Sequence, residues 1–145
     1  MNSERGAVGG IEVLPFGLLV FVAGALLIAN AWAVVDAKLA VESAAREAGR
    51  AYVEAGNADA ADQAARGATR SAIEGTGRDP ARLSLSNNRP PYVRCAVVEH
   101  EASYRVPALT IPILGGFGRG AEVRGRHREI IDPFAAGLGS AEACG

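Results

Sequence analysis

Residues 13–35 are VLPFGLLVFVAGALLIANAWAVV, a stretch without a single charged side chain. As an α-helix rising about 1.5 Å per residue, it reaches roughly 35 Å, enough to cross the ~30 Å hydrocarbon core of a bilayer. A surface helix of a soluble domain would keep a polar stripe for solvent, whereas here only Asn30 interrupts the apolar surface. The stretch therefore predicts a transmembrane helix over residues 13–35.

The flanks of this stretch predict its orientation. In residues 1–11 only Arg5 and the amino terminus are positive, and Glu4 offsets one of them, so the positive-inside rule gives a small preference for a cytoplasmic N-terminus. Residues 36–145 are numerous enough for one domain with a modest core. We expect a cytoplasmic N-terminal segment over 1–12, a single-pass helix over 13–35 in the lipid bilayer of the cell membrane, and an extracytoplasmic α+β domain over 36–145.

Composition bears on partners and on redox state. The chain has 145 residues and a formal net charge of -1, without the clustered basic surface that nucleic-acid binding requires, so no nucleic-acid partner is expected. Its two cysteines, Cys95 and Cys144, lie in the part expected outside the membrane, where an oxidising environment permits a disulfide between them. Two unpaired thiols are the alternative.

The helix is expected to continue beyond the apolar stretch as one unbroken element to about Ala55. Over residues 34–55, small apolar residues recur at alternating spacings of three and four, which marks one face of a helix. This face can pack against the domain's own sheet or against a neighbouring copy of the chain. It carries Val34, Ala37, Val41, Ala44, Ala48, Ala51 and Ala55, and Gly56 is placed to end the helix.

A second, shorter helix is predicted next, followed by strands. Asp59 is the expected N-cap of this helix and Gly75 its expected end. Its shared face carries Ala61, Ala65, Ala68 and Ala72.

Apolar and polar residues alternate after the second helix, which predicts strands over residues 82–86, 92–106 and 121–132. The expected fold class is therefore α+β. It comprises a long N-terminal transmembrane helix extended into an amphipathic helix, a second short helix, and a small three-stranded antiparallel sheet.

The charges of the last two strands predict their pairing. With Val106 opposite Ala121 in an antiparallel pair, opposite charges meet on one face and mostly apolar side chains on the other. A shift of one residue would destroy this match. The charged pairs are Arg105–Glu122, Glu101–Arg126 and Glu99–Arg128, and the other face pairs Tyr104 with Val123 and His100 with His127.

The connection between these two strands, residues 107–120 (PALTIPILGGFGRG), is unusually apolar for a loop. One interpretation is that its apolar side chains cover the small core of the domain. The other is that they contact a membrane or a neighbouring subunit. The side chains concerned are Leu109, Ile111, Ile113, Leu114 and Phe117.

No group of residues indicates an enzyme. No nucleophile occurs in a recognisable motif, and the glycines of residues 115–120 lie between strands rather than before a helix, unlike a phosphate-binding loop. His100, His127 and Glu129 share a face and invite a metal ion, but a site needs three or four ligands in tight geometry, so two structural histidines are favoured. We expect no enzymatic activity, no small-molecule substrate, no cofactor and no metal.

Several short motifs occur in order around these elements. Arg5-Gly6, Ile11-Glu12 and Pro15 lie at or before the start of the apolar stretch, and its continuation, the paired strands and their flanks contain Ala44-Ala45-Arg46-Glu47, Tyr104-Arg105-Val106-Pro107 and Asp132-Pro133-Phe134. With this order the chain resembles the TadE-like family, the minor pilin-like proteins of tight-adherence (Flp, type IVc) pilus systems in bacteria. The resemblance implies a pilin-like subunit in the cytoplasmic membrane that assembles through its N-terminal helix with other pilin-like subunits and the pilus assembly machinery.

The resemblance also implies a processing and assembly site. A prepilin peptidase would remove a short leader that ends in glycine and leave glutamate at the fifth position. Counting back from Glu12 puts this cut between Ala7 and Val8, with Gly6 one place too early. The chain is then either cut after Ala7 or kept whole as an anchored assembly factor. Glu12 would meet a neighbouring subunit's amino terminus, where a low dielectric strengthens the ion pair.

A secreted soluble binding domain is the competing interpretation. Ala29-Asn30-Ala31 and Ala31-Trp32-Ala33 both fit the small-x-small pattern at which signal peptidase cuts, and either cut would release the domain. The length of the apolar stretch and the helical pattern that continues from Val34 favour an intact anchor.

Overall fold

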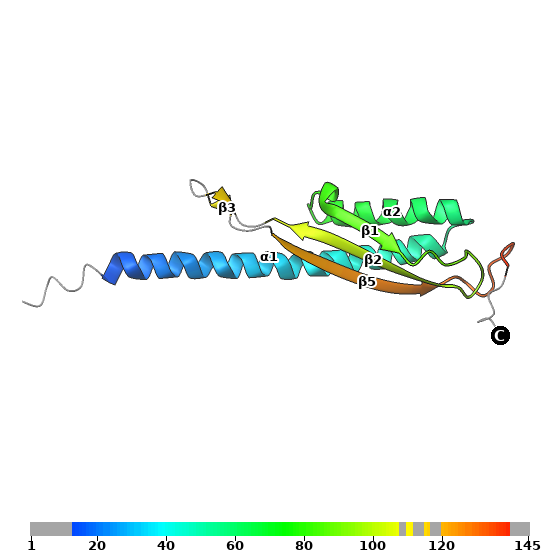
Figure 1. Cartoon of the computed structure of the whole chain (residues 1–145), viewed down its shortest axis with the longest axis horizontal. Helices are drawn as coiled ribbons and strands as arrows, with labels where there is room; N and C mark the ends of the chain where they lie inside the picture. The colour runs from blue at the N-terminus through cyan, green and yellow to red at the C-terminus, as the bar shows by residue number, and fades with distance from the viewer. Residues whose placement is uncertain (1–12, 108–109, 112–114, 117–119, 140–145) are drawn as a thin grey trace, which may run out of the picture. The chain divides into compact units, whose positions relative to one another are not determined.

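The computed structural model (Figure 1) describes residues 13–107, 110–111, 115–116 and 120–139. The contacts divide the chain into two compact units, Met1–Ala33 and Val34–Gly145. The predicted α+β fold is confirmed, with a long apolar N-terminal helix, a second helix and a three-stranded antiparallel sheet. The elements in order are α1 (Val13–Val53), α2 (Ala58–Gly75), the 3₁₀-helix η1 (Pro80–Arg82), β1 (Leu83–Asn87), β2 (Val97–Val106), β3 (Thr110–Ile111), β4 (Gly115–Gly116) and β5 (Ala121–Ile130).

Helix α1 runs without a break from Val13 to Val53, as the expected continuation beyond the apolar stretch requires. It ends two residues before the predicted position at Ala55. The hydroxyl of Tyr92 donates hydrogen bonds to the carbonyls of Tyr52, at 3.2 Å, and of Ala55. These carbonyls lie at the helix end, where intrahelical donors run out, so a side chain from a distant loop completes the terminus of α1.

The main sheet has the strand order β1-β2-β5, and all neighbours are antiparallel. The predicted register of β2 and β5 is confirmed over its whole length, because Val106 lies opposite Ala121, Tyr104 opposite Val123 and His100 opposite His127. The predicted alternation is confirmed as well. One face of β2 is buried along its length through Val98, His100, Ala102, Tyr104 and Val106, and Ala96 just before the strand is buried as well.

Two strands begin later than the sequence pattern predicted. Residues 80–82 form η1 rather than strand, so β1 starts at Leu83. Strand β2 starts at Val97 rather than at residue 92, because Cys95 adopts a φ of 62°, a left-handed conformation that extended backbone does not accommodate. Strand β5 ends at Ile130, two residues before the predicted end at residue 132.

Helices α1 and α2 cover the same face of the sheet and build its core. One cluster of buried residues joins Val41 of α1, Ile73 of α2 and Tyr104 of β2, and a second joins Tyr52, Ala65 and Val98. The apolar face predicted on residues 34–55 therefore packs against the domain's own sheet. Its buried members are Ala37, Val41, Ala44 and Ala48, and the structure adds Ala40, Ala45, Gly49 and Tyr52.

Two glycines let α1 lie close to β5. A Cβ atom on Gly125 would lie 2.7 Å from the backbone nitrogen of Glu42, and one on Gly49 would lie 2.8 Å from Cγ of Glu129. Neither distance is compatible with a larger residue unless the neighbouring group moves. The helix and the strand thus meet backbone to backbone at Gly125.

The second helix differs from its prediction in its cap and in its buried face. Asn57, rather than Asp59, is the N-cap, and its side-chain oxygen accepts a hydrogen bond from the Ala60 amide at 3.0 Å. Asp59 lies inside the first turn, so its side chain is too far along the helix to cap it. The buried residues are Ala61, Ala65, Thr69 and Ile73, whereas Ala68 and Ala72 are only partly buried.

In the connection over residues 107–120, Thr110 and Ile111 of β3 pair antiparallel with Gly116 and Gly115 of β4. The sequence pattern did not predict this two-stranded sheet. Leu109, Ile113, Leu114 and Phe117 lie outside the described residues. Whether the apolar side chains of the connection cover the core or contact a partner stays a prediction.

Candidate functional site on the N-terminal helix

The first half of α1 is an exposed apolar surface. Phe16 is 69% exposed, Phe21 73% and Trp32 73%, and the most apolar 18-residue window of the helix has no buried residue. A core helix of a soluble protein is mostly buried and covers its apolar residues. Within the described residues, α1 is the one helix that is long and apolar enough to cross a membrane.

The second half of α1 has a different environment. From Ala37 onward one side of the helix is buried under the sheet, while its other side carries Lys38, Glu42, Arg46 and Arg50. Lys38 forms an i,i+4 ion pair with Glu42 at 3.0 Å and also donates to the backbone carbonyl of Arg124 in β5. One helix therefore carries a surface without internal partners and, further along, the main packing surface of a folded domain.

The predicted processing and assembly residues Gly6, Ala7, Val8 and Glu12 lie outside the described residues, and their roles stay predictions. Pro15 lies in the first turn of α1, where its missing amide costs no helical hydrogen bond. Cys95 is disulfide-bonded. Cys144 lies outside the described residues, so the predicted bridge between the two cysteines stays a prediction.

His100 and His127, the two histidines considered for metal binding, have different environments. His100 is completely buried against the ring of Tyr52, with a centroid distance of 5.1 Å, and its ring nitrogens have no hydrogen-bond partner in the described structure. Burial lowers the pKa of His100, Asp62 opposes part of this lowering, and His127 adds a still smaller lowering.

His127 is half-buried, and its Nε2 lies 2.8 Å from Oε1 of Glu129. Within the described part of the chain, no three metal-ligating side chains come together. The histidines are thus engaged with different neighbours, His100 with an aromatic ring and His127 with a carboxylate.

The outer face of the sheet, away from the helices, carries the charged pairs. Two of the three predicted pairs form: Arg128 lies 2.6 Å from Glu99, and Arg126 binds Glu101. The third does not form. Although Arg105 lies opposite Glu122 in the register, the Glu122 carboxylate binds Arg124 at 2.8 Å, two residues along its own strand.

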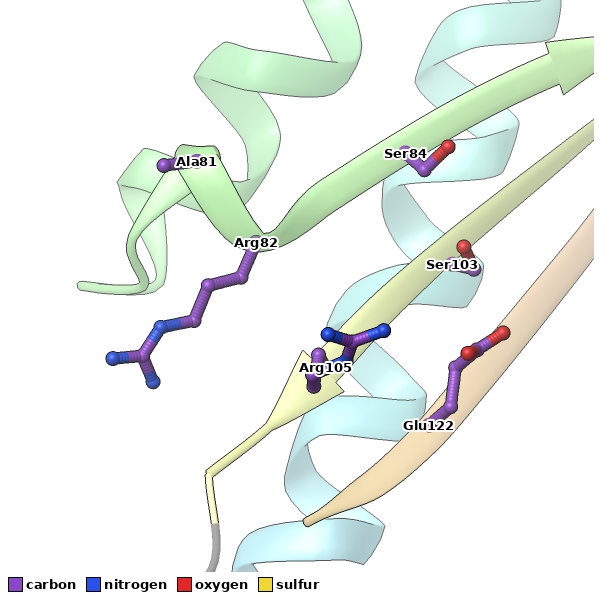
Figure 2. A pocket seen from close by; sticks show the side chains of 6 residues that line it. All are labelled: Ala81, Arg82, Ser84, Ser103, Arg105 and Glu122. Carbon is purple, nitrogen blue, oxygen red and sulfur yellow. The ribbon is translucent and has the colours of Figure 1, made fainter. Parts of the chain in front are cut away.

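The outer face also has a depression at one end (Figure 2), which was not predicted from the sequence. It has a volume of about 440 Å³ and is lined by Ala81, Arg82, Ser84, Ser103, Arg105 and Glu122. These residues come from η1, β1, β2 and β5, so no local motif could have revealed it. The only signal in the sequence was the strand register, which placed Arg105 and Glu122 opposite each other.

Comparisons of the chain with protein-family models, with curated proteins and with solved structures find no match. The functional inference therefore depends on the exposed apolar helix, the domain built on its second half and the sequence motifs around it.

Proposed function

We propose that this chain is a membrane-anchored, minor pilin-like subunit that takes part in the assembly of tight-adherence type IV pili. In this proposal residues 13–35 cross the cytoplasmic membrane, residues 1–12 lie in the cytoplasm and residues 36–145 form the extracytoplasmic domain. The role is structural and requires no cofactor, no small-molecule substrate and no nucleic acid. The partners are the lipid bilayer, other pilin-like subunits, the assembly machinery and a prepilin peptidase.

One observation supports the proposal most strongly. A single helix of 41 residues has an exposed apolar first half, and its second half supplies the central buried surface of an antiparallel α+β domain. Exposed apolar surface of this extent is unfavourable in water, because removing apolar surface from water lowers the free energy by about 25 cal/mol for each Å². A bilayer or the helices of neighbouring subunits would cover it, and both environments occur during assembly of a subunit from the membrane.

The helix also bears on the alternative of a secreted domain. Both candidate signal-peptidase sites, at Ala31 and at Ala33, lie inside α1, where the backbone amides and carbonyls are hydrogen-bonded within the helix. A peptidase needs extended backbone, so this helix would have to open before either cut. The helical continuity of residues 13–53 therefore favours the anchored form.

Glu12 and the amino terminus provide the proposed assembly contact. A carboxylate at the edge of a membrane-spanning helix is costly unless it is solvated or paired. The amino terminus of a neighbouring subunit is a cation that can pair with it, and the low dielectric of a bilayer or a filament interior strengthens this pair.

The test is the N-terminal residue of the mature protein recovered from cells. A start at Val8 is expected for a processed pilin-like subunit, and a start at Met1 for an anchored assembly factor that keeps its leader. In both cases the protein should fractionate with the cytoplasmic membrane. A start at Trp32 or Val34 in the soluble exported fraction would overturn the proposal in favour of a secreted domain.

A further inference from the structure

The depression on the outer face of the sheet combines hydroxyl and guanidinium donors. Ser84 of β1 lies opposite Ser103 of β2 in the register, and Figure 2 shows both hydroxyls on the same face as the guanidinium of Arg105. In the described part of the chain neither hydroxyl has a hydrogen-bond partner, although each can donate one bond. The depression therefore offers several donors to a ligand that accepts hydrogen bonds.

Its charges favour an anion. The guanidinium of Arg105 has no carboxylate partner among the described residues, because Glu122 is bound to Arg124 at 2.8 Å. Arg82, the last residue of η1, is only loosely paired, since its Nε lies 3.5 Å from Asp79. Guanidinium groups present planar sets of donors that match phosphate oxygens, so Arg105 beside the two hydroxyls suits a phosphate group, while the guanidinium of Arg82 points away from them (Figure 2).

The depression lies at the end of the domain where α1 enters it. Arg78, four residues before Arg82, binds Asp36 at 2.5 Å, and Val106, next to Arg105, belongs to the same buried cluster as Ala37. Asp36 is the first charged residue after the apolar stretch. Asp36 directly follows the stretch proposed to span the bilayer, so along the chain this is the end of the domain next to the membrane-spanning residues.

We propose that this depression binds the phosphate group of an anionic glycerophospholipid with a hydroxylated headgroup, such as phosphatidylglycerol. Arg105 binds the phosphate oxygens, Ser84 and Ser103 donate hydrogen bonds, and the Glu122 carboxylate accepts a bond from a headgroup hydroxyl. The inference rests on the proposed membrane anchor. It adds a lipid preference that an apolar helix alone would not confer.

The experiment measures lipid selectivity of the full-length chain. The protein is held in mixed micelles that contain equal amounts of phosphatidylglycerol and phosphatidylcholine, and native mass spectrometry gives the ratio of the two lipids retained. The wild-type chain should retain an excess of phosphatidylglycerol. Arg105→Gln should lower this ratio about fivefold, the usual effect of one basic residue at an anionic surface.

A matched control is Arg128→Gln, which removes the same charge from the same face. Arg128 is paired with Glu99 and lines no part of the depression, so its substitution should leave the lipid ratio unchanged. Ser103→Ala is a second variant without a charge change, and it should lower the ratio by a smaller factor. Equal ratios in wild type, Arg105→Gln and Arg128→Gln would overturn the inference.

Two further outcomes separate the possible sources of phosphate and the two proposals. Inorganic phosphate at the concentration of the lipid should not displace phosphatidylglycerol, and displacement would overturn a lipid as the ligand. A chain that stays in the membrane but shows no lipid preference would overturn the lipid site alone. A domain recovered from cells with Trp32 or Val34 as its first residue would overturn the anchor, whatever the lipid ratio.

Discussion

His100 and Thr69 are the polar residues in the described structure that have no exposed surface. The hydroxyl of Thr69 donates to the Ala65 carbonyl at 2.6 Å, whereas His100 has no hydrogen-bond partner for either ring nitrogen. A buried imidazole without partners favours its neutral form, because a charge there would lose its hydration. The fold is thus coupled to the protonation of one histidine.

Acid should therefore destabilise the domain through His100. Burial lowers the pKa of His100 in the folded domain. Asp62 and His127 are the titratable groups that act on it, and the neighbouring hydroxyl of Tyr52 is neutral because burial raises its pKa. On acidification, His100 binds a proton in the unfolded chain at a higher pH than in the folded domain. The contribution of neutral His100 to the free energy of unfolding is therefore fully present above about pH 6.5, and it is lost as the pH falls from there through the lowered pKa of the folded domain. Urea unfolding of the full chain in micelles between pH 8 and pH 5 measures this loss.

The matched variants for this prediction are His100→Leu and His127→Leu. The first should flatten the dependence between pH 6.5 and pH 5, while the second should keep it, since His127 is half-buried beside Glu129. An unchanged slope in His100→Leu would show that other groups cause the acid sensitivity.

Gly125 tests how closely helix and strand must approach. Gly125→Ala places a methyl group 2.7 Å from the Glu42 backbone, so α1 and β5 must separate, and we expect a loss of about 1–3 kcal/mol in the free energy of unfolding. Gly67→Ala is the control. Gly67 is exposed inside α2 with no atom within 4 Å of its added Cβ, and alanine there should stabilise by about 1 kcal/mol.

Both glycine variants can be compared by urea unfolding with circular dichroism as the signal. Equal stabilities of Gly125→Ala and wild type would mean that the contact relaxes without cost. At this scale the sequence predicted which residues face each other, but not which neighbour a flexible side chain selects. Glu122 shows the difference, because it faces Arg105 in the register and binds Arg124.

At the scale of elements, alternation and charge were sufficient to predict the register of β2 and β5. All ten residue pairs between β2 and β5 have the predicted register, because a shift of one residue would have placed charged side chains in the core. The start of β2 was predicted wrongly because alternation continues through residues 92–96, while the positive φ of Cys95 breaks the strand there. Cysteine has no preference for the left-handed conformation, so no sequence pattern indicated that the strand would break here.

The cap of α2 provides the prediction at this scale. Asn57→Ala removes the acceptor of the Ala60 amide and should lower the free energy of unfolding by about 1 kcal/mol. Asp59→Ala removes only a first-turn charge and should cost less, since its interaction with the helix dipole is exposed. Urea unfolding of the two variants at one pH compares the effects, and a larger loss for Asp59→Ala would contradict the assignment of the cap.

At the scale of the whole molecule, the sequence predicted the order and class of the elements because hydrophobic period and length determine them locally. The depression beside Arg105 could not be predicted in the same way, since three segments that are distant in sequence contribute to it: residues 81–84, 103–105 and 122. Residues 6–8 were suggested by the family resemblance alone, whereas Glu12 also stands out as a carboxylate at the edge of the apolar stretch. They need tests on the assembled protein.

Glu12→Gln is that test for the assembly contact. The substitution removes a charge that precedes residues 36–145 in the sequence, so the far-UV spectrum and the unfolding midpoint should stay unchanged while pilus formation is strongly impaired. The measurement is the number of pili on cells in which the variant replaces the wild-type chain. Glu4→Gln removes a similar charge from the N-terminal segment and should assemble normally; normal pili in Glu12→Gln would exclude the proposed ion pair.

The bond between Lys38 and the Arg124 carbonyl has a consequence for how copies of the chain can join. Strand β5 lies at an edge of the sheet and is ten residues long, a length at which exposed edges recruit foreign strands and aggregate. Lys38 occupies one of its backbone acceptors, the carbonyl of Arg124, and its ammonium group places a charge beside this edge. Pairing of this edge with a foreign strand is thereby discouraged, so the assembly proposed for this chain would use the apolar helix rather than the sheet.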